Sequence, residues 1–238
     1  MKQFLDACLK TNLQISKYLD NICESDLEFS PELGYDNNQS YKLDLKCEEI
    51  FIEHLNDLGQ IFSEESGLIG KNSPYKIILD PLDGSSNFVS KIPFYGTSAA
   101  LFKDEKAQSA FICNLANYEI LAFDGHKSLK SNLLNPCYSP FLPHPFSQVG
   151  VVEKITLCPS LISYLVQNKL KFRSLGATAL SIAYASYFSF VLVLGKTRIF
   201  DTAGALMLCK DLHIENNENF LLISKDKQTF DIILEFFK

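Results

Sequence analysis

The sequence predicts an α/β fold in which layers of helices pack against mixed sheets. Two observations carry this prediction. Helical and strand patterns alternate in the second half of the chain, whereas three successive strand patterns between residues 93 and 123 predict an antiparallel meander. With 238 residues, 47% of them hydrophobic, the chain can bury a full core, and we expect a single domain of one compact unit.

The N-terminal part begins with two helical patterns. Apolar residues recur at spacings of three and four from Phe4 to about Ile22, which predicts an amphipathic helix. Residues 30–40 collect proline, glycine, aspartate and asparagine, and a mobile loop is expected there. A second helical pattern opens at Asp44, where the carboxylate is suited to an N-cap, and runs to Leu58.

Strands dominate the middle of the chain, and strands alternate with helices after it. A proline-containing irregular connection at 136–145 separates the two parts. Asp201 is predicted to cap a helix that reaches Cys209, and the chain ends in a strand and a helix after residue 220. The expected strands are 61–62, 75–79, 93–103, 108–113, 118–123, 149–153, 170–174 and 188–194, and the expected helices are 158–169 and 176–185.

Charge and cysteine usage argue against several classes of protein. The net charge of −6 argues against a nucleic-acid surface, which is normally basic. Seven scattered cysteines without a Cys-x-x-Cys pair indicate a reducing compartment and argue against a zinc site. The N-terminus lacks the apolar run of a signal peptide, and no apolar stretch approaches the roughly 20 residues that span a bilayer. A soluble cytoplasmic protein without membrane or nucleic-acid partners is expected.

The stretch Asp-Pro-Leu-Asp-Gly-Ser-Ser-Asn-Phe at 80–88 is the strongest functional signal. It follows the buried strand predicted at 75–79, and open α/β sheets place their sites at the carboxyl ends of strands. Pro81 fixes its own φ and lacks an N–H, which favours a stiff bend over a continued strand. Such a bend allows Asp80 and Asp83 to face one point.

The residues that follow are suited to holding a phosphate. Gly84 lets the backbone approach a ligand closely, and Ser85 and Ser86 supply N–H and hydroxyl groups. Two aspartates in a turn are, by themselves, more often a turn signal than a site. The interpretation therefore depends on the acidic residues elsewhere in the chain.

Three segments occur in a diagnostic order: Glu65 in a Ser-Glu-Glu-Ser loop, the stretch 80–88, and Phe-Asp-Thr-Ala-Gly at 200–204. In this order they resemble the inositol monophosphatase and fructose-1,6-bisphosphatase superfamily of magnesium-dependent phosphatases. The likeness runs from about residue 44 to residue 211 and looks closest to the archaeal-type enzymes that act on both substrates.

The resemblance implies the αβαβα five-layer sandwich of that superfamily, the sugar phosphatase fold. It implies a metal-binding α+β half at 1–125 and a smaller α/β half at 126–238 that supplies Asp201. It also implies a small phosphorylated metabolite as partner, inhibition by lithium, and a homodimer.

The resemblance also assigns roles to single residues. Glu65 and the hydroxyl of Ser85 are expected to orient the attacking water, with Asp44 beside the metal site, whereas Glu64 is expected to be solvated. Oxygen ligands without histidine or thiolate suit Mg²⁺ rather than zinc, and two or three Mg²⁺ are implied. The implied metal ligands are Glu65, Asp80, the carbonyl of Leu82, Asp83 and Asp201.

Two arginines lie on segments that flank the expected pocket, and a guanidinium can bind phosphate oxygens bidentately. Arg198 and Arg173 therefore predict a preference for bisphosphorylated sugars over inositol monophosphates, although Arg173 is equally suited to an ordinary surface position. Two alternatives stay open: a 3′-phosphoadenosine 5′-phosphate phosphatase, and a phosphate- or metal-binding homologue without catalysis. The expected substrate-binding residues are Gly84, Ser85, Ser86, Arg173, Gly176 and Arg198.

Overall fold

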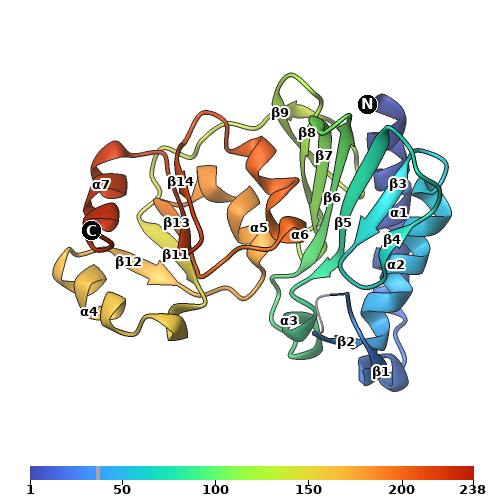
Figure 1. Cartoon of the computed structure of the whole chain (residues 1–238), viewed down its shortest axis with the longest axis horizontal. Coiled ribbons are helices and arrows are strands. Elements are labelled where there is room, and N and C mark those ends of the chain that lie inside the picture. The colour runs from blue at the N-terminus through green and yellow to red at the C-terminus, as the bar shows by residue number, and fades with distance from the viewer. Residues whose placement is uncertain (36–37) are drawn as a thin grey trace.

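The computed structural model describes residues 1–35 and 38–238, and it confirms the α/β class and the five alternating layers (Figure 1). Two long N-terminal helices cover one face of an eight-stranded sheet, short helices fill the space between that sheet and a five-stranded sheet, and two further helices cover the outer face. The α-helices are α1 (Lys2–Asp20), α2 (Lys42–Leu55), α3 (Ser85–Val89), α4 (Ser160–Gln167), α5 (Thr178–Ala183), α6 (Ile199–Thr202) and α7 (Lys227–Glu235).

The eight-stranded sheet contains the predicted meander. Its strand order is β10-β9-β8-β7-β6-β5-β3-β4, and neighbours run antiparallel except for β3 and β5. The sheet continues past residue 125, because β9 and β10 add to its far edge. Its strands are β3 (Gln60–Ser63), β4 (Gly67–Ile69), β5 (Tyr75–Asp83), β6 (Gly96–Lys103), β7 (Lys106–Asn114), β8 (Glu119–Phe123), β9 (Ser128–Asn132) and β10 (Ser139–Pro140).

The five-stranded sheet combines parallel and antiparallel pairs in the order β12-β11-β13-β15-β14. The first three strands run parallel, which requires crossover connections, and helices α4 and α5 supply them. The antiparallel pairs follow at β15 and β14. Its strands are β11 (Val149–Glu153), β12 (Lys171–Arg173), β13 (Phe190–Leu194), β14 (His213–Asn216) and β15 (Phe220–Ser224).

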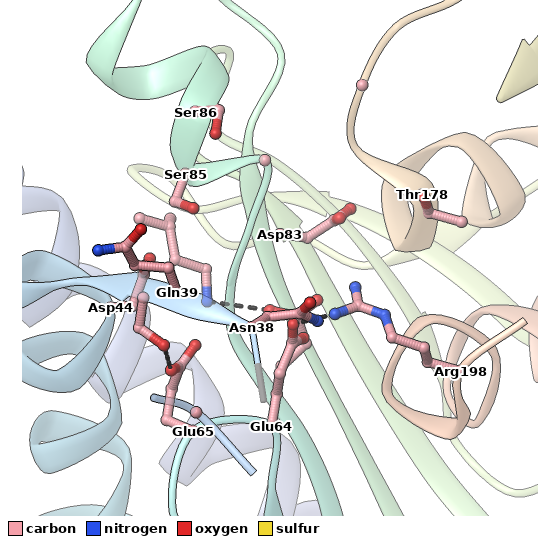
Figure 2. Close-up of a pocket in the computed structure, with 16 residues that line it drawn as sticks. Asn38, Gln39, Asp44, Glu64, Glu65, Asp83, Ser85, Ser86, Thr178 and Arg198 are labelled. Atoms are coloured by element: carbon pink, nitrogen blue, oxygen red, sulfur yellow. Dashed lines mark hydrogen bonds and ion pairs between the residues drawn. The ribbon is translucent and has the colours of Figure 1, made fainter. Parts of the chain in front are cut away.

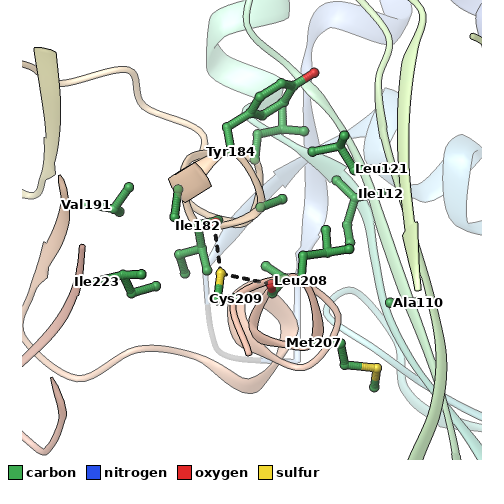
Figure 3. Close-up of a cluster of buried hydrophobic side chains, with 14 of the residues drawn as sticks. Ala110, Ile112, Leu121, Ile182, Tyr184, Val191, Met207, Leu208, Cys209 and Ile223 are labelled. Atoms are coloured by element: carbon green, nitrogen blue, oxygen red, sulfur yellow. Dashed lines mark hydrogen bonds between the residues drawn. The ribbon is translucent and has the colours of Figure 1, made fainter. Parts of the chain in front are cut away.

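Central strands are apolar on both faces because each sheet is covered on both sides. On β7, Phe111 packs toward α1 and α2, whereas its neighbour Ile112 faces the layer between the sheets. Val191 on β13 faces the same layer from the other sheet. Figure 3 shows Ile112 and Val191 on either side of Ile182 from α5. This shared core holds the two sheets together.

The loop expected at 30–40 is wrong over much of its length. β1 (Phe29–Leu33) and β2 (Gln39–Tyr41) form an antiparallel pair there, and the rings of Phe29 and Tyr41 stack with centroids 4.5 Å apart. Cross-strand aromatic pairs of this kind stabilise a short sheet whose sequence is rich in turn residues. Asp36 and Asn37 of the expected loop lie outside the described residues.

Several short strands were not predicted, namely β4, β9, β10 and β14. Their segments are brief, and that of β9, Ser-Leu-Lys-Ser-Asn, is mostly polar, so the pairing of β9 with β8 compensates for the missing apolar alternation. All seven cysteines are free. No helix in the described part of the chain is both long and apolar enough to cross a membrane.

Candidate active site

Three buried aspartates meet at the carboxyl end of β5. The strand itself supplies Asp80 and Asp83, and α6 supplies Asp201 from the other half of the chain. One carboxylate oxygen from each residue lies within 4.8 Å of those of the other two. The fold therefore brings together acidic residues that are far apart in the sequence, at the sheet edge where such sites are expected.

Pro81 shapes the end of β5 without ending it. The strand was expected to stop at residue 79, but it continues to Asp83, and its register against β6 shifts between Asp80 and Asp83. Proline has no N–H to donate to a neighbouring strand. It is therefore tolerated within a strand at such an irregularity, where the regular pairing is interrupted. The N–H of Leu82 then donates to Asp80 Oδ1 over 3.1 Å, which fixes the first carboxylate.

The two aspartates on β5 receive few hydrogen bonds for buried, charged carboxylates. Asp83 Oδ2 accepts the N–H of Leu180 at 2.8 Å, but Asp80 Oδ2 is buried and has no hydrogen-bond partner among the described residues. Burial raises the pKa of Asp80, and the nearby Glu64 raises it further; burial and then Asp201 do the same for Asp83. An unpartnered oxygen in an all-carboxylate site fits a hard cation such as Mg²⁺.

Arg198 balances the third aspartate. It is the N-cap residue of α6, and its Nε and Nη2 donate to the two carboxylate oxygens of Asp201 at 3.0 and 2.8 Å. Its Nη1 donates to Glu64. Asp201 is the third residue of α6, so its predicted N-cap position is wrong; the helix also ends at Thr202, and a separate 3₁₀ helix covers Ala205–Leu208.

The prediction for Glu64 is also wrong. We expected a solvated side chain, but it is 16% exposed, pairs with Arg198 and lines the cleft. Burial raises its pKa, and the guanidinium of Arg198 opposes that rise. A sequence with two adjacent acids does not reveal which one points inward, and here both do.

Glu65 and Asp44 form a second acidic group on the other side of Glu64. The hydroxyl of Ser40 donates to Glu65, and burial raises the pKa of Glu65 to about 7. Burial, followed by the charge of Glu65, raises the pKa of Asp44 to about 8. Carboxyl groups with pKa values near neutrality are suited to moving protons at the pH of the cell.

Asp44 does not cap α2 as predicted. The helix begins at Lys42 with Tyr41 as N-cap, and Asp44 is its third residue. Its Oδ2 accepts the N–H of Tyr41 at 2.8 Å, whereas Oδ1 is buried without a partner in the part of the chain that the structure describes. That oxygen can receive a proton or a ligand.

The turn between β5 and α3 forms one corner of the site. Gly84 has a φ of +81°, and a Cβ atom there would lie 2.8 Å from that of Ala177. Ser85 and Ser86 follow as the first residues of α3, where helical N–H groups have no partner within the helix. Glycine is therefore required both by the backbone conformation and by the close approach of the opposite wall.

Most of these groups, but not the fully buried Asp201, line a cleft of about 200 Å³ between the two halves of the molecule. In Figure 2, Asp44, Glu65 and Ser85 lie on one side, with Thr178 and Arg198 on the other. The lining residues are Gly34, Asn38, Gln39, Ser40, Asp44, Glu64, Glu65, Asp80, Leu82, Asp83, Gly84, Ser85, Ser86, Gly176, Thr178 and Arg198.

The two arginines expected to bind substrate differ in position. Arg173, on β12, is exposed, does not line the cleft, and donates from Nη1 to the carbonyl of Phe172 at 2.7 Å. Its expected place beside the pocket is therefore corrected. Arg198 does line the cleft, but it donates to Asp201 and Glu64, and its role toward a substrate stays a prediction.

The sequence did not identify Glu48, whose carboxylate supports the loop that contains Glu64 and Glu65. Its buried carboxylate accepts the N–H of Ser66 at 3.0 Å and also the hydroxyl of Ser66. Glu48 lies four residues after Asp44, a spacing that places both on one face of α2. That spacing was the signal in the sequence from which the position of Glu48 beside the site could have been predicted.

The model of the inositol monophosphatase family matches residues 27–212. The chain belongs to the inositol monophosphatase family. Family relatives include the fructose-1,6-bisphosphatase of Pyrococcus furiosus, 32% identical over 150 residues that cover 60% of this chain and 54% of that protein, so the match spans about half of that relative. The fructose-1,6-bisphosphatase/inositol-1-monophosphatase of Methanocaldococcus jannaschii is 24% identical over 208 residues, 79% of this chain and 81% of that one.

Solved structures of family proteins share the fold. The fructose-1,6-bisphosphatase of Leishmania major in holo form has a TM-score of 0.80 at 17% identity, covering 98% of this chain and 93% of that one. The inositol monophosphatase of Thermotoga maritima has a TM-score of 0.77 at 17% identity, covering 99% and 98%. The αβαβα architecture of this chain is therefore that of known family structures.

Proposed function

We propose that the chain is a Mg²⁺-dependent phosphatase that hydrolyses phosphate monoesters of a small sugar or of inositol, with fructose-1,6-bisphosphate and inositol-1-phosphate as candidate substrates. The observation that carries this proposal is the juxtaposition of Asp80, Asp83 and Asp201 beside the turn at Gly84 and Ser85. Family membership and relatives named as phosphatases support the reaction class.

The donor set fits the proposed metal. Asp80, Asp83 and Asp201 offer carboxylate oxygens, and the buried, unpartnered Asp80 Oδ2 calls for a cation. Glu65 and the carbonyl of Leu82 line the same cleft and complete the proposed ligand set for two or three Mg²⁺. Bound Mg²⁺ supplies Lewis-acid polarisation of phosphate oxygens and stabilises negative charge on the leaving oxygen.

The chain's own groups divide the remaining work. Backbone N–H groups of Gly84 and Ser85 and the hydroxyls of Ser85 and Ser86 are proposed to orient the phosphate. Glu65, held by Ser40, is proposed to orient the attacking water and accept its proton. Asp44, with one carboxylate oxygen free, is proposed to assist that proton transfer. No covalent phosphoenzyme is required.

A second candidate substrate class is a nucleotide phosphate. A bifunctional NADP phosphatase/NAD kinase of Methanocaldococcus jannaschii is 26% identical over 219 residues, 76% of this chain and 38% of that protein. This relative favours including NADP beside 3′-phosphoadenosine 5′-phosphate, the nucleotide alternative considered from the sequence. The non-catalytic alternative predicts no release of phosphate from any of these.

The test is the release of inorganic phosphate from four substrates by the purified chain, with Mg²⁺ and with a chelator. We expect release from fructose-1,6-bisphosphate or inositol-1-phosphate with Mg²⁺ only, and inhibition by Li⁺. Full activity in chelator would contradict the metal requirement, and no release from any substrate would contradict catalysis. The proposed homodimer is checked on the same sample by light scattering, and the proposed cytoplasmic location by fractionation of the source cells.

A further inference from the structure

Glu153 is a buried carboxylate that the proposed chemistry leaves without a role. It ends β11, is 3% exposed, and faces the turn that follows β12. None of the ion pairs in the described part of the chain involves it. A buried charge without a cation destabilises the fold unless hydrogen bonds satisfy it. The groups that donate hydrogen bonds to Glu153 therefore indicate its role.

Those donors come from Gly176, which lines the cleft, and from Leu175 and Ser181 close to it in the chain. The N–H of Gly176 lies 3.1 and 3.2 Å from the two carboxylate oxygens of Glu153, and the N–H of Leu175 lies 3.3 Å from Oε1. The hydroxyl of Ser181, on α5, donates over 2.6 Å. The carboxylate therefore ties the turn at 175–176 to the start of α5.

The same turn is held from the opposite side by Asn87. The side-chain Nδ2 of this buried residue donates to the carbonyls of Leu175 and Phe94, each at 2.7 Å. Gly176 has a φ of +80°, and a Cβ atom there would lie 3.1 Å from Asn87 Oδ1. The turn is thus fixed by one side chain from each half of the molecule.

The position of this turn sets the width of the cleft. Gly176 and Thr178 line the cleft opposite Gly84 and Ser85, and a Cβ atom at Gly84 would lie only 2.8 Å from that of Ala177. A shift of the turn would move this wall relative to the corner at Gly84. The carboxylate oxygens of β5 would keep their positions. Among the residues that the structure describes, the one link between them and the moving segment is the hydrogen bond that the N–H of Leu180 donates to Asp83.

We propose that Glu153 is a positioning residue for the substrate, because its carboxylate holds the backbone of Leu175 and Gly176 as the wall against which the non-phosphate part of the substrate binds. The kinetic part of this inference rests on the proposed phosphatase function, whereas the conformational part does not. A wall that contacts bound substrate equally in the ground and transition states affects KM rather than kcat.

The test compares Glu153→Gln with Ser181→Ala. Glutamine keeps the shape and one acceptor oxygen, but it removes the charge that strengthens the bonds to Oε1 and places an amide N–H₂ at the position of Oε2, against the N–H of Gly176; Ser181→Ala removes one bond to the carboxylate and leaves the backbone bonds of Leu175 and Gly176. We expect both variants to lower the melting temperature. Only Glu153→Gln should raise KM, by about tenfold, with kcat within about twofold and with the Mg²⁺ dependence unchanged.

Amide hydrogen exchange supplies the readout that needs no catalysis. In Glu153→Gln, the peptide that contains 175 and 176 should exchange about tenfold faster than in the wild type, and in Ser181→Ala it should not. Unchanged exchange, or a loss confined to kcat, overturns the proposal. A wild-type chain without phosphatase activity contradicts the proposed function, and the exchange comparison then decides this inference alone. If Glu153→Gln does not fold, Asn87→Ala takes its place, with the same two expected effects.

Discussion

Single carboxylates in the cleft differ in what balances their charge. Asp201 is fully buried and receives two N–H groups of Arg198, whereas Asp80 receives, from the described residues, one backbone N–H and leaves an oxygen unpaired. Asp83 lies between these cases, with one N–H from Leu180. The residues with the fewest internal partners gain most from a bound cation, because a buried carboxylate without compensation is costly.

Loss of one metal ligand should abolish most of the activity. We expect Asp83→Asn and Asp201→Asn each to lower kcat by roughly 10²-fold or more, since removal of a ligand charge takes several kcal/mol from the transition state. Steady-state phosphate release checks this. Asp124→Asn is the matched control, because Asp124 lies in a turn away from the cleft and its carboxylate accepts the N–H groups of His126 and Lys127. Near-normal turnover in both folded site variants would show that the site lies elsewhere.

Arg198 competes with metal for Asp201, and this competition is measurable. In Arg198→Gln, we expect the concentration of Mg²⁺ that half-saturates the protein to fall about tenfold, because a charge-assisted pair of about 1.5–3 kcal/mol no longer has to be broken or shared. The metal-free protein should melt at a lower temperature. Melting curves titrated with Mg²⁺ check both effects.

Arg173→Gln is the control for that titration, because this exposed arginine lies outside the cleft. It should leave both the Mg²⁺ response and the melting temperature unchanged. Unchanged or weaker Mg²⁺ binding in Arg198→Gln would contradict the competition. It would return Arg198 to its expected role, in which it binds the second phosphate of a bisphosphorylated sugar.

At the scale of elements, the sequence predicted the long helices and strands that have a clear apolar periodicity. It missed the short strands whose formation depends on pairing with a neighbouring strand. The helix from Phe4 and the meander are confirmed because apolar periodicity and covering layers agree. The starts of α2 and α6 were expected too far along the chain, because an aspartate at the third position, Asp44 or Asp201, resembles a cap in sequence. β9 and β14 depend on neighbouring strands that a local pattern does not contain.

The turn between β5 and α3 should tolerate no side chain at Gly84. Gly84→Ala incurs about 1–2 kcal/mol for its left-handed conformation and, in addition, a clash with Ala177. Gly70→Ala is the control, since Gly70 has a φ of +84° but faces only the side chain of Asn56. We expect Gly84→Ala to lower the free energy of unfolding by more than Gly70→Ala does, and to be alone in losing phosphatase activity. Equal losses of stability would show that Ala177 moves aside.

At the scale of the whole molecule, the site is assembled from parts that no local pattern connects. Asp44 comes from α2, Glu65 from the loop after β3, and Asp201 from α6 across the cleft. The likeness to a family predicted that these residues belong together, and the structure brings Asp44 and Glu65 to one cleft and places the buried Asp201 against Asp80 and Asp83, which line it. It did not predict the roles of Glu64, Glu48 or Glu153. Two adjacent acids do not reveal which one points inward, and a single glutamate at the end of an apolar run or on a helix is usually on the surface.

The acidic cluster should make stability of the metal-free protein fall as pH rises. The folded pKa values of about 8 for Asp44 and about 7 for Glu65 lie above the ordinary values of 3.8 and 4.5. Between those limits the unfolded chain has already lost protons that the folded chain still binds, so the free energy of unfolding decreases with pH. In chelator, we expect the melting temperature to be lower at pH 8 than at pH 5. Excess Mg²⁺ should raise it most at pH 8.

Asp44→Asn should reduce the fall of the melting temperature between pH 5 and pH 8 in chelator, because the amide does not titrate. Asp124→Asn should leave it unchanged, since the backbone N–H groups of Lys127 and His126 hold the pKa of Asp124 below its ordinary value and the group is ionised in both states above pH 5. A melting temperature that rises from pH 5 to pH 8 in chelator would contradict the assignment of protonated carboxyl groups in the folded, metal-free chain.

The strand orders of the two large sheets also bear on how copies of the chain can associate. The outermost strands are β4 and β10 in one sheet and β12 and β14 in the other, and each has between two and four residues. Such short borders offer few free backbone groups, so an incoming strand would gain few hydrogen bonds. Open-ended stacking of the two large sheets into fibres is thereby disfavoured, and a dimer of this chain is not expected to form by extension of either large sheet across two copies.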